Sequence, residues 1–362
     1  MLKVTIVAGA RPNLMKIAPI VHSIQKARSD NIKIDFRLVH TGQHYDQNMS
    51  GSFFEQLEIP KPHVNLECKG GSQAEQTAKI MIQFEKELIS NPADLVLVVG
   101  DVTSTMACAL VAQKLFTKVA HVEGGIRSND WTMPEEINRL VTDSITNYFF
   151  TTSETANTNL KKSGVDGSQI FFVGNTMIDT LMKQRPNFKK PQIWKDLQLS
   201  NGNYIVMTLH RPNNVDEQCQ LRDMINEIIA NTRDLHLVFP VHPRTQKILK
   251  RLNIDHPRLH AIEPLSYLEF NYLVERAKAV ITDSGGVTEE ASVLRVPCLT
   301  LRNNTERPET ITLGTNELIG TDPKRLKSYL KILFNGNWKK GHDIPLWDGH
   351  AADRIVECIK NI

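Results

Sequence analysis

Short runs of aliphatic residues, separated by segments long enough for amphipathic helices, recur along the chain and constrain its fold more than any other feature. Most runs are rich in Val, Ile and Leu without strict alternation, which is typical of strands covered on both faces. The expected strands are Val4–Ala8, Phe36–His40, Leu95–Val99, Val119–Val122, Tyr148–Thr152, Ile170–Val173, Tyr204–Leu209, Leu235–Val241, Leu259–Ile262, Ala279–Thr282 and Pro297–Leu301. Strands that alternate with helices predict an α/β fold with parallel sheets.

The strand pattern pauses once, near the middle of the chain. Residues 184–202 are polar and contain Pro186, Pro191 and Gly202, as expected for part of a connection between domains. A chain of 362 residues is also long for one hydrophobic core and sufficient for two. We therefore expect two Rossmann-like domains, over residues 1–175 and 176–348, and a short helix over residues 349–362.

Composition and charge argue against several classes of function. The formal net charge is only +3, and the basic residues are scattered, so no nucleic-acid or membrane partner is expected. No apolar stretch approaches the roughly 20 residues that span a bilayer. The chain enters a strand pattern directly after Met1, which does not resemble a signal peptide.

The five cysteines predict the cellular compartment. They are Cys68, Cys108, Cys219, Cys298 and Cys358, an odd number with wide spacing and no CxxC pair. This pattern favours free thiols in a reducing cytosol over disulfides or a zinc site.

The most specific functional motif lies near the C-terminus. The apolar run Ala279–Ile281 is followed by Asp283-Ser284-Gly285-Gly286 and a helix-forming segment. A strand, a Gly-Gly turn and a helix start place backbone N–H groups in front of an anion. Glu290 follows about one turn later and could accept two sugar hydroxyls, while Arg307 could fork onto phosphate. A diphosphate linked to ribose fits this set, although each piece alone also has a simpler reading as a turn, a helix-dipole partner or a loop arginine.

Other polar motifs follow the predicted strands, and in parallel sheets ligands bind beyond the carboxyl ends of the strands. These motifs are Gly9-Ala10-Arg11-Pro12 with Lys16, Gly100-Asp101, His121-Val122-Glu123-Gly124-Gly125-Ile126-Arg127, Pro134-Glu135-Glu136, His210-Arg211 and His242-Pro243-Arg244. The first strand is not followed by GxGxxG, and no Walker A motif occurs. The sequence therefore predicts neither nicotinamide dinucleotide binding nor ATP hydrolysis.

All of these motifs except His242-Pro243-Arg244 carry a resemblance, together with Asp283-Ser284-Gly285-Gly286, Gly42-Gln43-His44 and Thr305-Glu306-Arg307-Pro308-Glu309. In their order along the chain they resemble the non-hydrolysing UDP-N-acetylglucosamine 2-epimerases of bacteria and archaea over nearly the whole chain. The resemblance implies the GT-B architecture, in which two Rossmann-like domains with parallel sheets face each other across a cleft. It also implies that the helix over residues 349–362 returns to the first domain, and that the protein is a cytoplasmic homodimer.

The resemblance implies reversible inversion at C2 of UDP-N-acetylglucosamine, which gives UDP-N-acetylmannosamine. The C2 proton is not next to a carbonyl, so the family eliminates UDP to form 2-acetamidoglucal and then adds UDP back. Inversion needs proton-transfer groups on both faces of the sugar, and departure of UDP needs fixed cations and N–H groups. No metal or redox cofactor is expected.

The resemblance also implies roles for residues that match the family motifs. The resemblance implies that the acid/base carboxylates are Asp101, Glu123 and Glu135, and that His210 assists departure of UDP. The residues it implies for substrate binding are Arg11, Lys16, Ser284, Gly285, Gly286, Glu290 and Arg307. Without the resemblance, Asp101 has an alternative as a helix N-cap and Glu135 as a helix-dipole partner. His210 and Lys16 would then be a strand-end histidine and a surface lysine.

The segment after His210 departs from the commoner family pattern. Pro212 stands where many members carry a second arginine, which some members use to bind UDP-N-acetylglucosamine as an activator. Proline has neither charge nor a donor N–H. We therefore expect turnover without an activator.

Four alternatives remain open at this stage. A hydrolysing epimerase would share the fold and release UDP and N-acetylmannosamine, and a related epimerase would act on a modified UDP-N-acetyl sugar. A GT-B glycosyltransferase would need an acceptor groove, for which the sequence offers no basic or aromatic patch. A UDP-sugar sensor would not need the carboxylates Asp101, Glu123 and Glu135.

Overall fold

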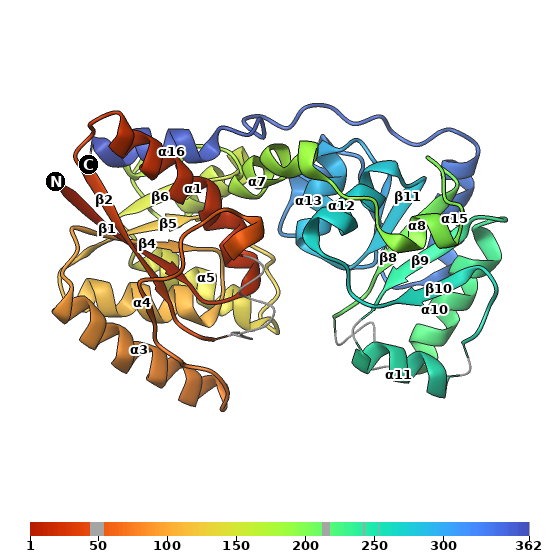
Figure 1. The fold of residues 1–362 in the computed structure, drawn as a ribbon, viewed down its shortest axis with the longest axis horizontal. Helices are drawn as coiled ribbons and strands as arrows, with labels where there is room; N and C mark the ends of the chain where they lie inside the picture. The colour runs from red at the N-terminus through yellow and green to blue at the C-terminus, as the bar shows by residue number, and fades with distance from the viewer. Residues whose placement is uncertain (44–53, 212–217, 242, 253, 362) are drawn as a thin grey trace. The chain divides into compact units, whose positions relative to one another are not determined.

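The computed structural model describes residues 1–43, 54–211, 218–241, 243–252 and 254–361 (Figure 1). The chain forms two compact units, one of residues 1–182 with 345–362 and one of residues 183–344. Helix α7 (Thr176–Gln184), which the sequence expectation assigned to the second domain, lies mostly in the first unit.

The first unit is built on a parallel sheet of seven strands in the order β3-β2-β1-β4-β5-β6-β7. Its strands are β1 (Leu2–Ala8), β2 (Ile34–His40), β3 (Val64–Asn65), β4 (Leu95–Val99), β5 (Lys118–Val122), β6 (Tyr148–Thr151) and β7 (Ile170–Phe172). The strand order reverses direction between β1 and β4, which is the position where doubly wound sheets bind ligands.

Helices cover the first sheet. They are α1 (Arg11–Ser29), α3 (Gln73–Ser90), α4 (Thr103–Lys114), α5 (Pro134–Ser144), α6 (Glu154–Lys162), α7 and α16 (Ala351–Lys360). Figure 1 shows α1 and α16 on one side of the sheet and α3 and α4 on the other. A capping box starts α3, since Ser72 Oγ accepts from the Glu75 N–H (3.2 Å) and the Glu75 carboxylate accepts from the Ser72 N–H (2.7 Å).

The last helix belongs to the first unit because its start is bonded there. Asp179 of α7 accepts hydrogen bonds from the backbone N–H groups of Ala351 (3.1 Å) and Ala352 (2.7 Å). Burial raises the pKa of Asp179 to about 6, although these two donors oppose the rise. The indole Nε1 of Trp347 also donates to the carbonyl of Thr152 at 2.9 Å.

The second unit contains a parallel sheet of six strands in the order β10-β9-β8-β11-β12-β13. Its strands are β8 (Tyr204–Thr208), β9 (His236–Pro240), β10 (Leu259–Ile262), β11 (Ala279–Thr282), β12 (Cys298–Thr300) and β13 (Asn316–Leu318). Its helices are α8 (Gln192–Asp196), α10 (Gln218–Asn231), α11 (Pro243–Arg251), α12 (Tyr267–Arg276), α13 (Gly285–Val293), α14 (Pro308–Thr312) and α15 (Pro323–Phe334). The prediction of two parallel α/β domains is confirmed.

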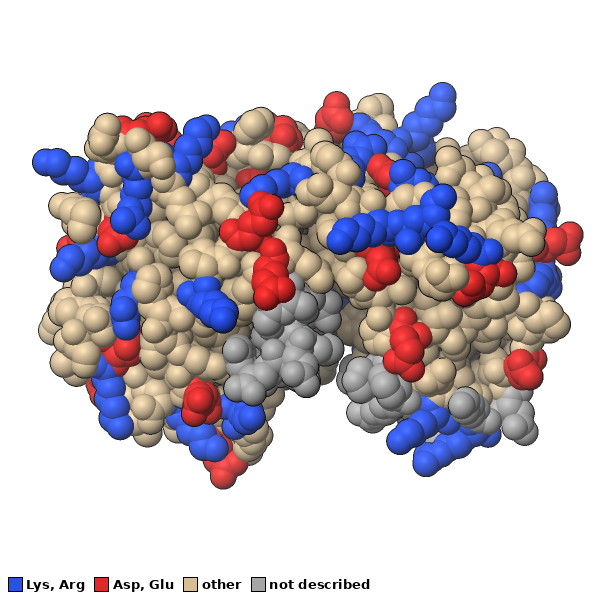
Figure 2. All heavy atoms as spheres, viewed as in Figure 1, with Lys and Arg blue, Asp and Glu red and all other residues tan. Residues whose placement is uncertain are grey.

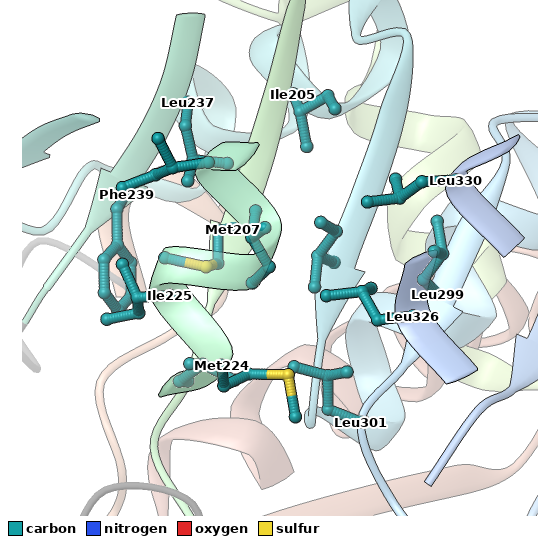
Figure 3. Close-up of a cluster of buried hydrophobic side chains, with 14 of the residues drawn as sticks. Ile205, Met207, Met224, Ile225, Leu237, Phe239, Leu299, Leu301, Leu326 and Leu330 are labelled. Atoms are coloured by element: carbon teal, nitrogen blue, oxygen red, sulfur yellow. The ribbon is translucent and has the colours of Figure 1, made fainter. Parts of the chain in front are cut away.

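One apolar core of the second unit lies between its sheet and the helices α10 and α15 (Figure 3). Strand residues such as Met207 and Phe239 meet Ile225 of α10 and Leu330 of α15 in one apolar cluster. Burial of such side chains contributes about 1.5–3 kcal/mol each.

Residues 184–202, which the sequence predicts as part of the connection, begin directly after the boundary between the units and belong to the second unit. They contain the 3₁₀ turn Arg185–Asn187 and the helix α8. Trp194 of α8 packs edge-on against the rings of Tyr204 (5.7 Å between centroids) and Tyr272 (5.2 Å). The aromatic residue holds this polar, proline-containing segment against the domain.

On the face shown in Figure 2, acidic and basic side chains are intermixed over both units. The described Cys68, Cys108, Cys298 and Cys358 are free thiols. Within the described ranges, the structure contains no helix that is both long and apolar enough to cross a membrane.

Candidate active site

Asn13 fixes the loop between β1 and α1. Its Oδ1 accepts hydrogen bonds from the N–H groups of Gly9 (3.1 Å) and Ala10 (2.9 Å), and its Nδ2 donates to the carbonyl of Val99 in β4 (3.1 Å). Gly9 has no room for a side chain, because a Cβ there would lie 2.2 Å from Oγ of Ser104. The loop is thereby held against the start of α4, at the switch point of the sheet.

Lys16 and Glu123 form a nearly buried ion pair beside this loop. Lys16 of α1 donates from Nζ to Oε2 of Glu123 at 2.8 Å, and the two side chains are 14% and 4% exposed. Glu123 follows β5 with a φ of 72°. A non-glycine residue at positive φ is uncommon, and such strain clusters at functional sites. A Cβ on Gly100 would meet Nζ of Lys16 at 3.2 Å and Oε2 of Glu123 at 3.9 Å, so both charges lie at the end of β4.

Arg139 of α5 forms a salt bridge with Asp101, the residue after Gly100. Its Nη2 and Nε donate to Oδ2 of Asp101 at 2.6 and 3.1 Å, and its Nη1 donates to Oε2 of Glu136 at 2.6 Å. Arg139 is buried, whereas the side chain of Asp101 remains 30% exposed. Asp101 is therefore both anchored and reachable.

The adjacent residues Glu135 and Glu136 at the start of α5 have different environments. Glu136 is buried and accepts hydrogen bonds from the N–H groups of Ser128 (2.9 Å) and Asn129 (3.0 Å). Burial opposes ionisation of Glu136, but these donors and Arg139 outweigh it and lower its pKa. Glu135 is half-buried, and no described residue donates a hydrogen bond to its carboxylate. The carboxylate of Glu136 is thus occupied by structural hydrogen bonds, while the carboxylate of Glu135 is free to contact a ligand.

A buried histidine supports the ends of both β4 and β5. Nε2 of His121 lies 2.8 Å from the carbonyl oxygen of Gly100, and Nδ1 lies 2.7 Å from Oδ1 of Asp143. Burial raises the pKa of Asp143, but His121 and Arg127 outweigh it and lower the pKa overall. Oδ2 of Asp143 also accepts from the Gly125 N–H at 3.0 Å. This network fixes the backbone on both sides of Glu123.

In the second unit, Asp283 organises the chain that follows β8. Its carboxylate accepts from the N–H groups of His210 (3.1 Å) and Arg211 (2.9 Å) and lies 2.8 Å from Nδ1 of His210. Asp283 is fully buried, whereas the imidazole of His210 is 60% exposed. The imidazole is held through Nδ1 and presents its other edge to solvent.

The start of α13 is open at its first residues. Ser284 is the N-cap, but its side chain makes no capping hydrogen bond. Ser284, Gly285 and Gly286 are all partly exposed, and a Cβ on Gly285 would meet no atom within 4 Å. The first N–H groups of a helix bind anions. This terminus therefore has both the donors and the space for a phosphate group.

Buried carboxylates follow along α13. Glu289 pairs with Nε of Arg307, and both side chains are buried. Glu290 accepts a hydrogen bond from the hydroxyl of Tyr267 at 2.8 Å. Burial raises the pKa of Glu290 to about 7, the Tyr267 hydrogen bond opposes the rise, and the charge of Glu289 adds to it.

Glu309 of α14 is a further buried carboxylate, 6% exposed. Neither of its oxygens has a hydrogen-bond partner among the described residues. Burial raises the pKa of Glu309 to about 7, although the charge of Arg307 opposes the rise. From the sequence, Glu309 is noted only as part of the motif over residues 305–309, and no role in the site is predicted for it or for Glu289.

The predicted residues thus form two groups, one in each unit. Lys16, Asp101 and Glu123 converge at the end of β4, and Glu135 lies on the helix that supplies Arg139. In the second unit, His210 is joined to the β11–α13 turn by Asp283, and Glu290 and Arg307 lie on adjoining elements. The side chains of Arg11 and Arg244, and residues His44, Pro212 and His242, lie outside the described part of the structure.

Over the part of the chain that the structure describes, no group of three or more His, Cys, Asp or Glu side chains is arranged to hold a metal ion.

Comparison with known proteins identifies relatives over the whole chain. Residues 25–360 match the family described as UDP-N-acetylglucosamine 2-epimerase. The UDP-N-acetylglucosamine 2-epimerase of Methanocaldococcus jannaschii is 40% identical, with 99% of each chain covered. The Pseudomonas aeruginosa UDP-2,3-diacetamido-2,3-dideoxy-D-glucuronate 2-epimerase is 38% identical, with 88% of each chain covered.

Solved structures agree with these relatives. The M. jannaschii UDP-GlcNAc 2-epimerase in complex with UDP-GlcNAc and UDP has a TM-score of 0.89 at 40% identity, with 100% of both chains covered. The Neisseria meningitidis UDP-GlcNAc 2-epimerase bound to UDP-GlcNAc has a TM-score of 0.90 at 30% identity, again with 100% of both chains covered. The chain belongs to the UDP-N-acetylglucosamine 2-epimerase family, as its motifs predicted.

Proposed function

We propose that this protein interconverts UDP-N-acetylglucosamine and UDP-N-acetylmannosamine without net hydrolysis. The observation that carries the proposal is the group of Asp101, Glu123 and Lys16 at the end of β4, in a chain whose family has this activity. Two anchored carboxylates beside a cation suit proton transfer at a carbon next to a departing anion.

In this proposal, the residues that bind the nucleotide lie in the second unit. The N–H groups at the start of α13 receive the diphosphate, Glu290 receives the ribose hydroxyls, and Arg307 adds positive charge. His210, oriented by Asp283, assists departure of UDP.

The reaction proceeds in two halves. A carboxylate removes the C2 proton, the C–H electron pair forms the C1–C2 double bond, and the C1–O bond breaks with its electrons going to UDP. UDP then adds back to C1 of the glucal, and a second group delivers a proton to the opposite face of C2. Asp101, Glu123 and Glu135 are the candidates for both transfers. Lys16 and Arg139 fix the orientation of Glu123 and Asp101.

Proton NMR of the purified protein with UDP-N-acetylglucosamine in D2O tests the proposal. Both epimers should appear as UDP-sugars and gain deuterium at C2. Release of free N-acetylmannosamine would identify a hydrolysing enzyme, and epimerisation without deuterium would exclude elimination. A parallel sample with the UDP-2,3-diacetamido sugar named for the P. aeruginosa relative tests the modified-sugar alternative, which predicts turnover of that sample alone.

We also propose that the protein works in the cytoplasm as a homodimer, with no nucleic-acid or membrane partner. The family resemblance supports the dimer, and the four described free thiols are compatible with a reducing compartment. Sedimentation equilibrium of the purified chain would give twice the monomer mass.

A further inference from the structure

Tyr267 makes direct contact with the carboxylate that the proposed function assigns to ribose. It is the first residue of α12, and its hydroxyl donates to Oε1 of Glu290 at 2.8 Å. The helix start is itself fixed by a capping box, in which Ser266 Oγ accepts from the Glu269 N–H and the Glu269 carboxylate accepts from Ser266. The donor therefore comes from a rigid position in a different element.

The two neighbouring carboxylates of α13 are held by different partners. Glu289 is paired with Arg307, whereas Glu290 is bonded to Tyr267. Glu290 is only 4% exposed. A buried carboxylate needs donors: Tyr267 supplies one to Oε1, and Asn271 of the same helix also favours the charged form of Glu290 and lowers its pKa. Each carboxylate oxygen can accept two hydrogen bonds, so acceptor capacity remains for a ligand. Glu290 therefore has its own hydrogen-bond donor and does not share the cation that pairs with Glu289.

We propose that Tyr267 is a positioning residue for the nucleotide: its hydroxyl occupies Oε1 of Glu290 and leaves Oε2 to receive the ribose hydroxyls. The inference rests on the proposed function, because it needs a nucleotide whose ribose meets Glu290. A carboxylate that is already oriented loses little side-chain freedom when the ligand binds, so the contact strengthens binding of ribose over deoxyribose.

The test compares UDP with 2′-deoxy-UDP, which lacks one of the hydroxyls assigned to Glu290. Calorimetry would measure both nucleotides with the wild type, Tyr267→Phe, Glu290→Gln and the double variant. Tyr272→Phe is the matched control, since it removes a hydroxyl from the same helix while leaving the contacts of its ring with Trp194 and Arg276. Thermal unfolding of every variant shows whether the fold is retained.

The expected result is a loss confined to the ribose contact. Tyr267→Phe should weaken UDP binding by up to about tenfold, the effect of one more side chain that must be immobilised when the nucleotide binds, and change 2′-deoxy-UDP binding much less. The double variant should bind UDP no more weakly than Glu290→Gln alone, because Tyr267 acts through Glu290. Tyr272→Phe should match the wild type.

Three other results overturn the inference. Equal losses for both nucleotides would show that Tyr267 acts through the fold or through another part of the nucleotide. Unchanged UDP binding in Tyr267→Phe would show that Glu290 needs no such partner. A wild type that binds neither nucleotide would refute the proposed function, and this inference with it.

Discussion

The ammonium of Lys16 and the carboxylate of Glu123 meet 2.8 Å apart at the end of β4, although one comes from α1 and the other from the end of β5. Their contact therefore links the helix that follows β1 to the residue that follows β5, across the switch point of the sheet. Glu123 has a positive φ, a backbone conformation that residues other than glycine rarely adopt.

We predict that Glu123→Gln and Asp101→Asn lower kcat far more than they raise KM. Both changes keep the shape of the side chain and remove its ability to transfer a proton, which typically contributes roughly 10²–10⁴-fold. Steady-state kinetics with UDP-N-acetylglucosamine would measure the effect. Glu85→Gln, on the exposed face of α3, is the control and should be silent. Variants that keep a tenth of wild-type kcat or more would place both carboxylates in structural roles.

Gly285→Ala should separate nucleotide binding from folding. The new Cβ meets no protein atom within 4 Å, and alanine in place of glycine at the start of α13 stabilises by about 0.5–1 kcal/mol. The same methyl group would occupy the space assigned to the diphosphate, so the Kd for UDP should rise by roughly tenfold or more. Unfolding curves and calorimetry measure the two effects. Gly167→Ala is the control: its Cβ also meets no atom, and it should leave UDP binding unchanged. If Gly285→Ala also left UDP binding unchanged, the diphosphate would not bind at the start of α13.

A third prediction concerns Arg307 and Glu289. Arg307→Met leaves Glu289 buried without its cation, which typically costs 3–5 kcal/mol of unfolding free energy. The double variant Glu289→Gln/Arg307→Met removes both charges and should recover most of that stability. UDP binding should stay weak in both variants if Arg307 contacts the nucleotide. Recovery of UDP affinity in the double variant would mean that the arginine serves only the fold.

A fourth prediction concerns the pH dependence of stability. The pKa of Glu309 is raised from 4.5 to about 7, so between these values the folded state holds a proton that the unfolded state has lost. The folded state therefore loses stability as the pH rises from about 4.5 to 7. Glu309→Gln mimics the neutral carboxyl, and its stability advantage over the wild type should grow to about 3 kcal/mol by pH 8.

Denaturant unfolding at pH 5 and pH 8 would measure this difference. Glu263→Gln is the control, because Glu263 is an exposed carboxylate in the same unit. A Glu309→Gln variant with the same stability as the wild type at both pH values would show that Glu309 finds a partner when folded.

The strands were predictable where burial on both faces left a continuous apolar run. Leu95–Val99 and Ala279–Thr282 have the expected bounds. The two short strands β3 (Val64–Asn65) and β13 (Asn316–Leu318) were missed, because each lies at a sheet edge and has no such run. The boundary between the units falls at residues 182–183, directly before the segment 184–202. The polar composition of this segment does not reveal that Trp194 packs against Tyr204.

The site was predictable only in part for a related reason. Asp101 and Glu123 follow strands, and the carboxyl ends of parallel strands meet at one edge. Their partners are set by packing between distant segments: Arg139 is far from Asp101 in sequence, and Tyr267 from Glu290. Nothing in the local pattern marks such pairs. The catalytic and binding roles themselves stay predictions, and so does the independence from an activator, since Pro212 lies outside the described residues.

The return of residues 345–362 to the first unit has a consequence for how the protein is made. Synthesis runs from the N-terminus, so Asp179 emerges when about half of the chain has been made, while its partners Ala351 and Ala352 emerge after the whole second unit. The second unit is therefore an insertion that can finish folding while the first still lacks α16. Until translation reaches that helix, the apolar side chains that it covers stay exposed in the nascent first unit, and such surface makes a folding intermediate prone to aggregate.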